Sequence, residues 1–203
     1  MQALLKLSRG IDRLNALVGR YVIWLILAAT IISGVNAVVR KVFHTSSNAF
    51  LEVQWYLFAA SFLLAAGYTL LEKEHVKVDV INARLSLRAR VWIDVIGFAL
   101  FLTPMCAIVL YYGTPFFLQA WNTGEMSSNA GGLIRWPVYL MMPLGFGLLL
   151  LQGISEFIKR IAFLAGLIDD PTVKIVDKTA EEELAEAIRK AEEEAARHSA
   201  KNA

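Results

Sequence analysis

Four long runs without a charged residue constrain this 203-residue chain more than any other feature. The runs are 19, 19, 30 and 20 residues long, and about 20 apolar residues are enough for a helix to cross the hydrocarbon core of a bilayer. Residues of the hydrophobic types make up 57% of the chain and charged residues only 19%, which excludes a soluble globular domain. The runs therefore predict an all-α membrane protein with four transmembrane helices, at about residues 21–39, 53–71, 92–121 and 136–157. The third run is longer than one crossing needs and contains Pro104 and Pro115, so we expect a kinked helix that projects beyond the bilayer.

The distribution of Lys and Arg predicts the orientation of the chain. Eleven of these cations lie before the first span, between the second and third spans, or directly after the fourth, whereas only three lie in the other two loops. Short cytoplasmic loops carry the excess of positive charge. Both termini are therefore expected in the cytoplasm, in a multi-pass protein of a bacterial inner membrane.

The segments outside the spans have their own patterns. Residues 3–18 place Leu4, Leu7 and Ile11 on one face beside several cations, which favours an interfacial amphipathic helix over an ordinary extension of the first span. Residues 125–136 are rich in turn formers and predict an outer loop.

The chain divides by composition into a four-helix membrane domain, residues 1–165, and a charged cytoplasmic tail, residues 166–203. Residues 75–80 alternate with period two and predict an extended link at the cytoplasmic surface, after which Ser86 caps the third helix. The tail is rich in Ala, Glu, Lys and Arg, which predicts a solvated C-terminal helix.

The few cysteines and histidines and the low net charge exclude several functional classes. The single Cys106 rules out an intramolecular disulfide, a CxxC redox motif and a thiolate zinc site. The three histidines, His44, His75 and His198, all lie outside the spans, so they do not suggest a heme. The net charge of +2 gives no reason to expect nucleic acid. We therefore expect no catalytic residue, no metal and no cofactor.

The polar residues inside the spans do not suggest an independent transporter. The acids Glu52, Asp94 and Glu156 all lie at span ends, whereas a transporter normally carries ionisable groups at mid-membrane. The amides and hydroxyls within the spans are typical of contacts between helices. Gly67 lies on a small-residue face of the second span that could pack within this chain or against a partner. This composition favours an accessory subunit.

Two motifs around the second span resemble a known family. Glu52-Val53-Gln54-Trp55 stands at its start, and His75-Val76-Lys77-Val78-Asp79 follows it. Pro143-Leu144-Gly145 in the fourth span fits the same pattern. The chain resembles the small permease (DctQ-like) subunit of tripartite ATP-independent periplasmic (TRAP) transporters over about residues 10–165.

The resemblance implies a partner-dependent function. A small subunit of this kind binds a large permease subunit of about twelve spans, surrounded by membrane lipid, and a periplasmic binding protein delivers the substrate. The substrates are usually organic acids, and a sodium gradient drives their uptake. The small subunit is implied to serve as a scaffold for the large one.

Seven residues are candidates for structural or subunit-interface roles. Glu52 could pair with Arg40, Lys41 or a partner's cation, or remain a solvated acid at a helix start, and Trp55 is expected at the headgroup level. Asp79 could pair with His75 or accept backbone N–H bonds at the inner surface. The full set is Glu52, Trp55, Gly67, His75, Asp79, Arg135 and Pro143.

Two other functions compete with this interpretation. A self-sufficient four-span exporter would need an acid near the middle of the first span, where residues 21–39 contain none. A membrane anchor of an enzyme or electron-transfer complex would need histidines in the spans or paired cysteines.

Overall fold

The computed structural model describes residues 2–44, 47–73 and 85–168, most of which are helical. The helices are α1 (Gln2–Phe43), α2 (Asn48–Leu71), α4 (Leu87–Gly97), the π-helical turn η1 (Phe98–Leu102), α5 (Thr103–Thr123) and α6 (Trp136–Leu164). Together α4, η1 and α5 make one helical stretch, and four stretches are long and apolar enough to cross a membrane. This confirms the four predicted spans.

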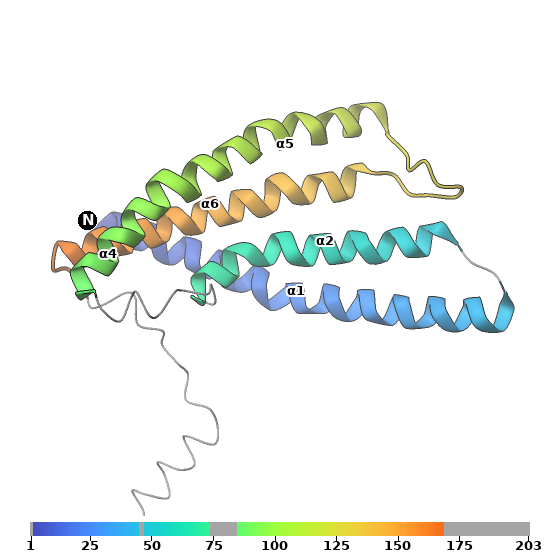
Figure 1. Ribbon diagram of the computed structural model, residues 1–203, viewed down its shortest axis with the longest axis horizontal. Coiled ribbons are helices and arrows are strands. Elements are labelled where there is room, and N and C mark those ends of the chain that lie inside the picture. Colours follow the sequence, from blue (N-terminus) through green and yellow to red (C-terminus); the bar gives the residue numbers. More distant parts are fainter. Residues whose placement is uncertain (1, 45–46, 74–84, 169–203) are drawn as a thin grey trace, which may run out of the picture. The chain divides into compact units, whose positions relative to one another are not determined.

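The helices lie side by side in the order α1, α2, α6 and α5 (Figure 1). Helix α6 is the central element, because it packs against α1, α2, α4 and α5. The start of α1 and the end of α6 lie at one end of the bundle, which we call the N-terminal end. The α5–α6 connection and the start of α2 lie at the other, which we call the loop end.

Helix α1 is longer than the predicted first span. Its 42 residues correspond to about 60 Å at the usual rise per residue, roughly twice the thickness of the hydrocarbon core. Residues 3–18 are therefore helical and continuous with the span, as in the predicted alternative of an ordinary extension of the first span. Their placement at the membrane surface stays a prediction. Of the expected apolar face, Ile11 is buried in the bundle, whereas Leu4 and Leu7 are exposed.

The third span changes its winding just before Pro104. The π-helical turn Phe98–Leu102 precedes that proline, and Thr103 Oγ1 donates a hydrogen bond of 2.8 Å to the carbonyl of Phe98. A proline lacks the N–H that an α-helix needs and clashes with the preceding turn, and a π-turn is one way to accommodate it. Ser86 Oγ accepts the N–H of Ala89 and caps the start of α4, as predicted.

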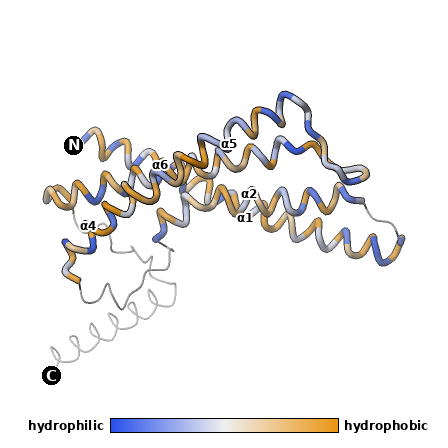
Figure 2. The backbone as a smooth tube through the Cα atoms, turned by 45° about the horizontal axis from the view of Figure 1, so that its top comes forward, coloured by the Kyte–Doolittle hydropathy of each residue, from blue (hydrophilic) through white to orange (hydrophobic). Residues whose placement is uncertain are grey.

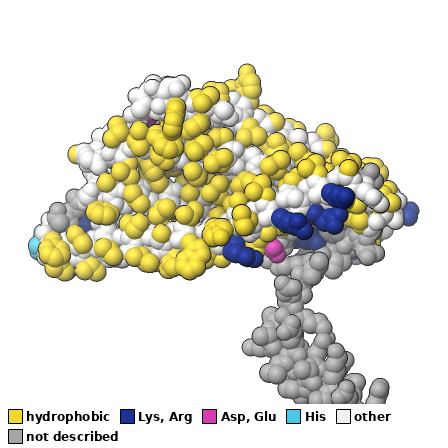
Figure 3. Space-filling model, turned by 180° about the vertical axis from the view of Figure 1, so that it is seen from behind, with side chains coloured by type: hydrophobic (Ala, Val, Ile, Leu, Met, Phe, Trp, Pro, Cys, Tyr) yellow, Lys and Arg dark blue, Asp and Glu magenta, His cyan; other side chains and the backbone are white. Residues whose placement is uncertain are grey.

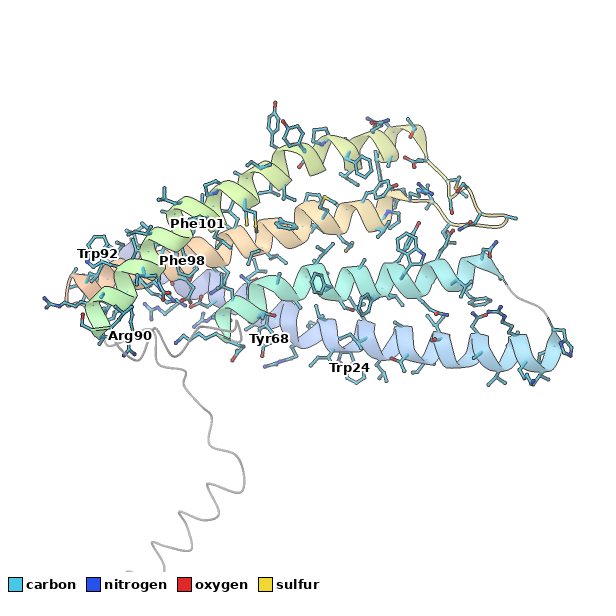
Figure 4. The ribbon with its side chains drawn as sticks, in the orientation of Figure 1. Trp24, Tyr68, Arg90, Trp92, Phe98 and Phe101 are labelled. Atoms are coloured by element: carbon cyan, nitrogen blue, oxygen red, sulfur yellow. The ribbon has the colours of Figure 1, made fainter. Side chains whose placement is uncertain are left out.

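Glycines bring α6 and α1 close to α2. A Cβ on Gly145 would stand 2.5 Å from the carbonyl oxygen of Leu63, so only glycine fits between the two backbones. Tyr68 of α2 lies against Gly19 of α1, in a space that a side chain on this glycine would otherwise fill (Figure 4). These close approaches show why the small residues stand where they do.

The surface of the described helices is largely apolar. Hydrophobic residues follow the helices, and hydrophilic residues gather toward the helix ends (Figure 2). Hydrophobic side chains also cover most of the face shown in Figure 3, where Lys and Arg gather mainly toward the N-terminal end. Large side chains such as Phe62, Phe101 and Tyr111 are more than 70% exposed, as expected where lipid or another membrane subunit covers them.

Candidate functional site

At the loop end, Glu52 holds the connection between α5 and α6. Its carboxylate accepts hydrogen bonds from the Leu133 backbone N–H (2.6 Å), from Asn129 Nδ2 (2.8 Å) and from Ser127 Oγ. The side chain stands in the second turn of α2 and is only 1% exposed. Hydrogen bonds to a charged acceptor are stronger than neutral ones, so this single carboxylate fixes the conformation of the loop.

This geometry corrects the expectation for Glu52. The acid does not pair with Arg40 or Lys41 in the described part of the chain, and it is not solvated at the helix start. The reason is local. The loop offers three donors that converge on the carboxylate, whereas Arg40 and Lys41 lie on α1 and are exposed.

Two further side chains of α2 bind the same loop. Asn48 Nδ2 donates to the carbonyl of Ala130 (2.9 Å), and Tyr56 Oη donates to the carbonyl of Ile134 (3.2 Å). With Glu52, these residues recur every four positions and form one face of the helix. This spacing was the sequence signal for the contact, and our sequence analysis missed it.

Arg135 closes the base of the loop. Its Nη1 lies 3.2 Å from Glu125 Oε1 and donates to Tyr139 Oη at 3.3 Å. Its backbone N–H donates to the carbonyl of Glu125, next to a single antiparallel bridge between Met126 and Ile134. The hydrogen bond to Tyr139, with the nearby Glu125 carboxylate, raises the pKa of Arg135 above its already high usual value. The guanidinium is therefore a permanent cation that joins the loop to the first turn of α6.

At the N-terminal end, Asp12 joins α1 to α6. Its carboxylate accepts hydrogen bonds from Gln152 Nε2 (2.9 Å) and Ser155 Oγ (2.7 Å), and Lys159 Nζ lies 2.9 Å from its second oxygen. Beside it, Asn15 Nδ2 donates to Gln152 Oε1 at 2.9 Å. Both amide residues are fully buried. Both amide atoms of Gln152 are hydrogen-bonded, whereas Asn15 Oδ1 has no partner among the described residues.

The same cluster reaches the third span through Arg160. This guanidinium is 3% exposed, binds the Glu156 carboxylate, and lies 2.9 Å from Asp94 Oδ2 of α4. It also stacks on the Phe98 ring, with 4.6 Å from Cζ to the ring centroid. Lys159 Nζ lies 2.6 Å from the other oxygen of Glu156. We call the polar residues of this cluster the inner network: Ser8, Asp12, Asn15, Asp94, Gln152, Ser155, Glu156, Lys159 and Arg160.

Only part of the inner network was predicted from the sequence. Asp94 and Glu156 were expected at span ends and Gln152 in contacts between helices, whereas no role was predicted for Asp12 or Asn15. The available signal was again helical spacing. Asp12 and Asn15 are three residues apart, and the polar residues of α6 recur at three- and four-residue intervals from Gln152 to Arg160.

The predicted candidates do not form one site. Glu52 and Arg135 hold the same loop, and Trp55, 48% exposed, stands one turn after Glu52 with its ring 4.5 Å from that of Tyr56. Gly67 is at the N-terminal end, where its missing side chain leaves room for Asn15 and for the carbonyl of Leu148, 3.1 Å from the position of a Cβ. Gly67 thus packs within this chain, which was one of its two predicted alternatives.

Three candidates remain. Pro143 lies inside α6 and is half-buried. His75 and Asp79 lie outside the described residues.

The polar and charged side chains of the described residues mainly join helices of this chain to one another. Within residues 2–44, 47–73 and 85–168, no group of three or more His, Cys, Asp or Glu side chains could hold a metal ion. The buried acids at both ends are hydrogen-bonded or paired with cations of the same chain. Such an arrangement defines a multi-pass helical membrane protein in which charged side chains join helices.

Comparison with protein families gives the particular class. The family described as "Tripartite ATP-independent periplasmic transporters, DctQ component" matches residues 29–163. The chain belongs to this family, so it is the small subunit of a TRAP transporter, and the family is one of transport components. TRAP systems of this family combine it with a large permease subunit and a substrate-binding protein. Comparison with curated proteins found no match, and neither did comparison with solved structures.

Proposed function

We propose that this chain is the scaffold of a sodium-driven transporter for organic acids, and that it touches neither the substrate nor the sodium ion. The large permease subunit carries both sites, and a periplasmic protein delivers the substrate. Both termini of the chain lie in the cytoplasm. The sodium gradient and the carboxylate substrate rest on membership of the family.

The hydrogen bonds of the polar side chains in the spans support the scaffold role. The hydroxyls of Thr30, Ser61 and Thr69 each donate to the carbonyl one turn earlier in their own helix, at 2.7–3.0 Å. Thr103 does the same across the π-turn. A sodium site needs several oxygens that converge on one point, and an anionic substrate at this depth needs a cation or a helix N-terminus aimed at it. These hydroxyls each donate their hydrogen within their own helix, and no hydrogen bond between helices gathers them at one point among the described residues.

The experiment measures uptake in proteoliposomes that hold the complex of this chain with its large subunit. The substrate is the radiolabelled carboxylic acid that the associated binding protein is found to bind. Thr30→Ala and Thr103→Ala should each change the apparent affinities for substrate and sodium by less than about twofold, since neither hydroxyl faces a ligand. Uptake is normalised to the amount of assembled complex.

The controls separate the parts of the proposal. Dissipation of the sodium gradient should abolish uptake, whereas removal of ATP should not. A large shift in sodium cooperativity from either alanine variant would place a coupling site in this chain and refute the scaffold role. Uptake that persists without a sodium gradient would refute the sodium dependence alone.

A further inference from the structure

A groove of about 440 Å³ lies between α1 and α2 near the loop end. Its lining includes Ser33, Asn36, Arg40 and Lys41 from α1 and Leu51 and Gln54 from α2. None of the groove's lining residues is acidic. The two cations follow directly after the uncharged run of the first span, so the groove lies where a membrane has its headgroups.

Two amides in the groove lack partners in the protein. Asn36 is 8% exposed and makes no hydrogen bond to the residues that the structure describes. Gln54 Nε2 is buried and has no acceptor among these residues. Buried amide groups are nearly always hydrogen-bonded, because an unmade bond is costly. Gln54 Nε2 is such a group. Beside it, the amide of Asn36 is not fully covered and has no partner among the described residues, so the groove offers donors to a ligand with acceptor oxygens.

The cations in the groove are also available. Arg40 and Lys41 are exposed, and neither forms an ion pair within the described part of the chain. The acid that was expected to pair with them, Glu52, is turned toward the loop and bound there. Two cations beside two amides, with no acid in the lining, favour an anion with several oxygens, and phosphate fits best.

The apolar surroundings of the groove favour the phosphate of a lipid over a free phosphate as the ligand. Large apolar side chains are exposed on both helices around it: Val38 (61%), Phe43 (69%), Leu51 (40%) and Trp55 (48%). Exposed apolar groups next to a basic pocket suit acyl chains next to a headgroup. We infer that this groove binds the phosphate of an anionic phospholipid, whose acyl chains lie along the apolar surface of α1 and α2.

The test is a titration of the purified full-length chain in detergent micelles with dioleoylphosphatidylglycerol, followed by native mass spectrometry. The double variant Arg40→Gln with Lys41→Gln should bind this lipid about tenfold more weakly or worse, because each cation near a membrane surface contributes to lipid attraction. The matched control is Arg9→Gln with Arg13→Gln. It removes the same charge from exposed positions of the same helix at its other end, and it should leave binding to the groove within about twofold.

A second variant tests the buried amide without changing its shape. Asn36→Asp turns the amide into a carboxylate that faces the phosphate, so the same lipid should again bind about tenfold more weakly. Unchanged lipid binding in both this variant and the Arg40/Lys41 variant would overturn the inference.

Two further results would assign the groove to another ligand. Inorganic phosphate that displaces phosphatidylglycerol at equal concentration would show a site for free anions. Loss of the large subunit from the Arg40/Lys41 variant, with lipid binding unchanged, would show that a protein acid occupies the groove.

Discussion

Replacement of Arg160 by Met tests the inner network most directly. Arg160 is the cation that joins α6 to α4, through Asp94, while it also binds Glu156 within α6. Methionine keeps much of the length and apolar volume of the side chain but removes the charge. The variant therefore measures what the ion pairs contribute to the free energy of unfolding, with little change in packing.

The expected loss follows from burial. Removal of one partner of a buried ion pair costs about 3–5 kcal/mol, because the other partner is left uncompensated. Glu156 is 1% exposed, but it keeps Lys159 at 2.6 Å. The expected loss is therefore near the lower limit, about 3 kcal/mol.

Unfolding in mixed detergent micelles, followed by circular dichroism, measures this loss as a difference in the free energy of unfolding. The control is Arg135→Met, the same substitution in a pair whose side chains are 33% and 38% exposed. It should cost about 0–1 kcal/mol. The second change Glu156→Leu in the Arg160→Met chain removes the acid that has lost one of its two cations and should restore part of the stability. Equal losses for Arg160→Met and Arg135→Met would refute the claim that burial makes the inner network strong.

Three more predictions follow from the fold. Gly145→Ala should destabilise the chain by about 1–3 kcal/mol, because the new Cβ would stand 2.5 Å from a backbone carbonyl oxygen of α2. The control Gly147→Ala should not destabilise it, because a Cβ there meets nothing within 4 Å. The free energies of unfolding of the two variants are compared in mixed micelles. In a background without the native cysteine, Ser128→Cys should react with a membrane-impermeant maleimide from the periplasm and Leu167→Cys should not; the reverse pattern would overturn the orientation. Glu52→Gln should speed hydrogen exchange in residues 126–134, since an amide oxygen cannot replace two carboxylate oxygens toward three donors.

The number of spans and their approximate positions could be predicted because they depend on local properties. A run of uncharged residues is expensive to expose to water, whichever neighbour it later contacts. The same holds for the Ser86 cap, which binds an N–H three residues away in sequence. The turn formers in residues 125–136 likewise indicated the loop between the third and fourth spans, where Gly131 has a φ of 70°.

The partners of the polar residues could not be predicted in the same way. Asp12 binds residues about 140 positions later, and Glu52 binds residues about 80 positions later. Sequence indicates that such a residue lies on a polar face, but the packing of the helices selects its partner. The expectation for Glu52 failed for this reason. Arg40 and Lys41 were the nearest cations in sequence, whereas the folded loop brought three donors closer.

The positions of these contacts support a static role for the chain. The carboxylate of Glu52 holds α2 to the α5–α6 loop at one end, and the inner network holds α1 and α4 to α6 at the other. Between the two ends, Gly145 lets α6 lie directly against the backbone of α2. A slide of α2 against α6 by one turn would break the Glu52 contacts and place a side chain against this glycine. A slide of α1 or α4 against α6 would break the ion pairs of the inner network. Interfaces of this kind are not continuously deformable. Under the proposed scaffold role, the large subunit supplies any element that moves within the membrane, and this chain supplies the surface against which that element moves.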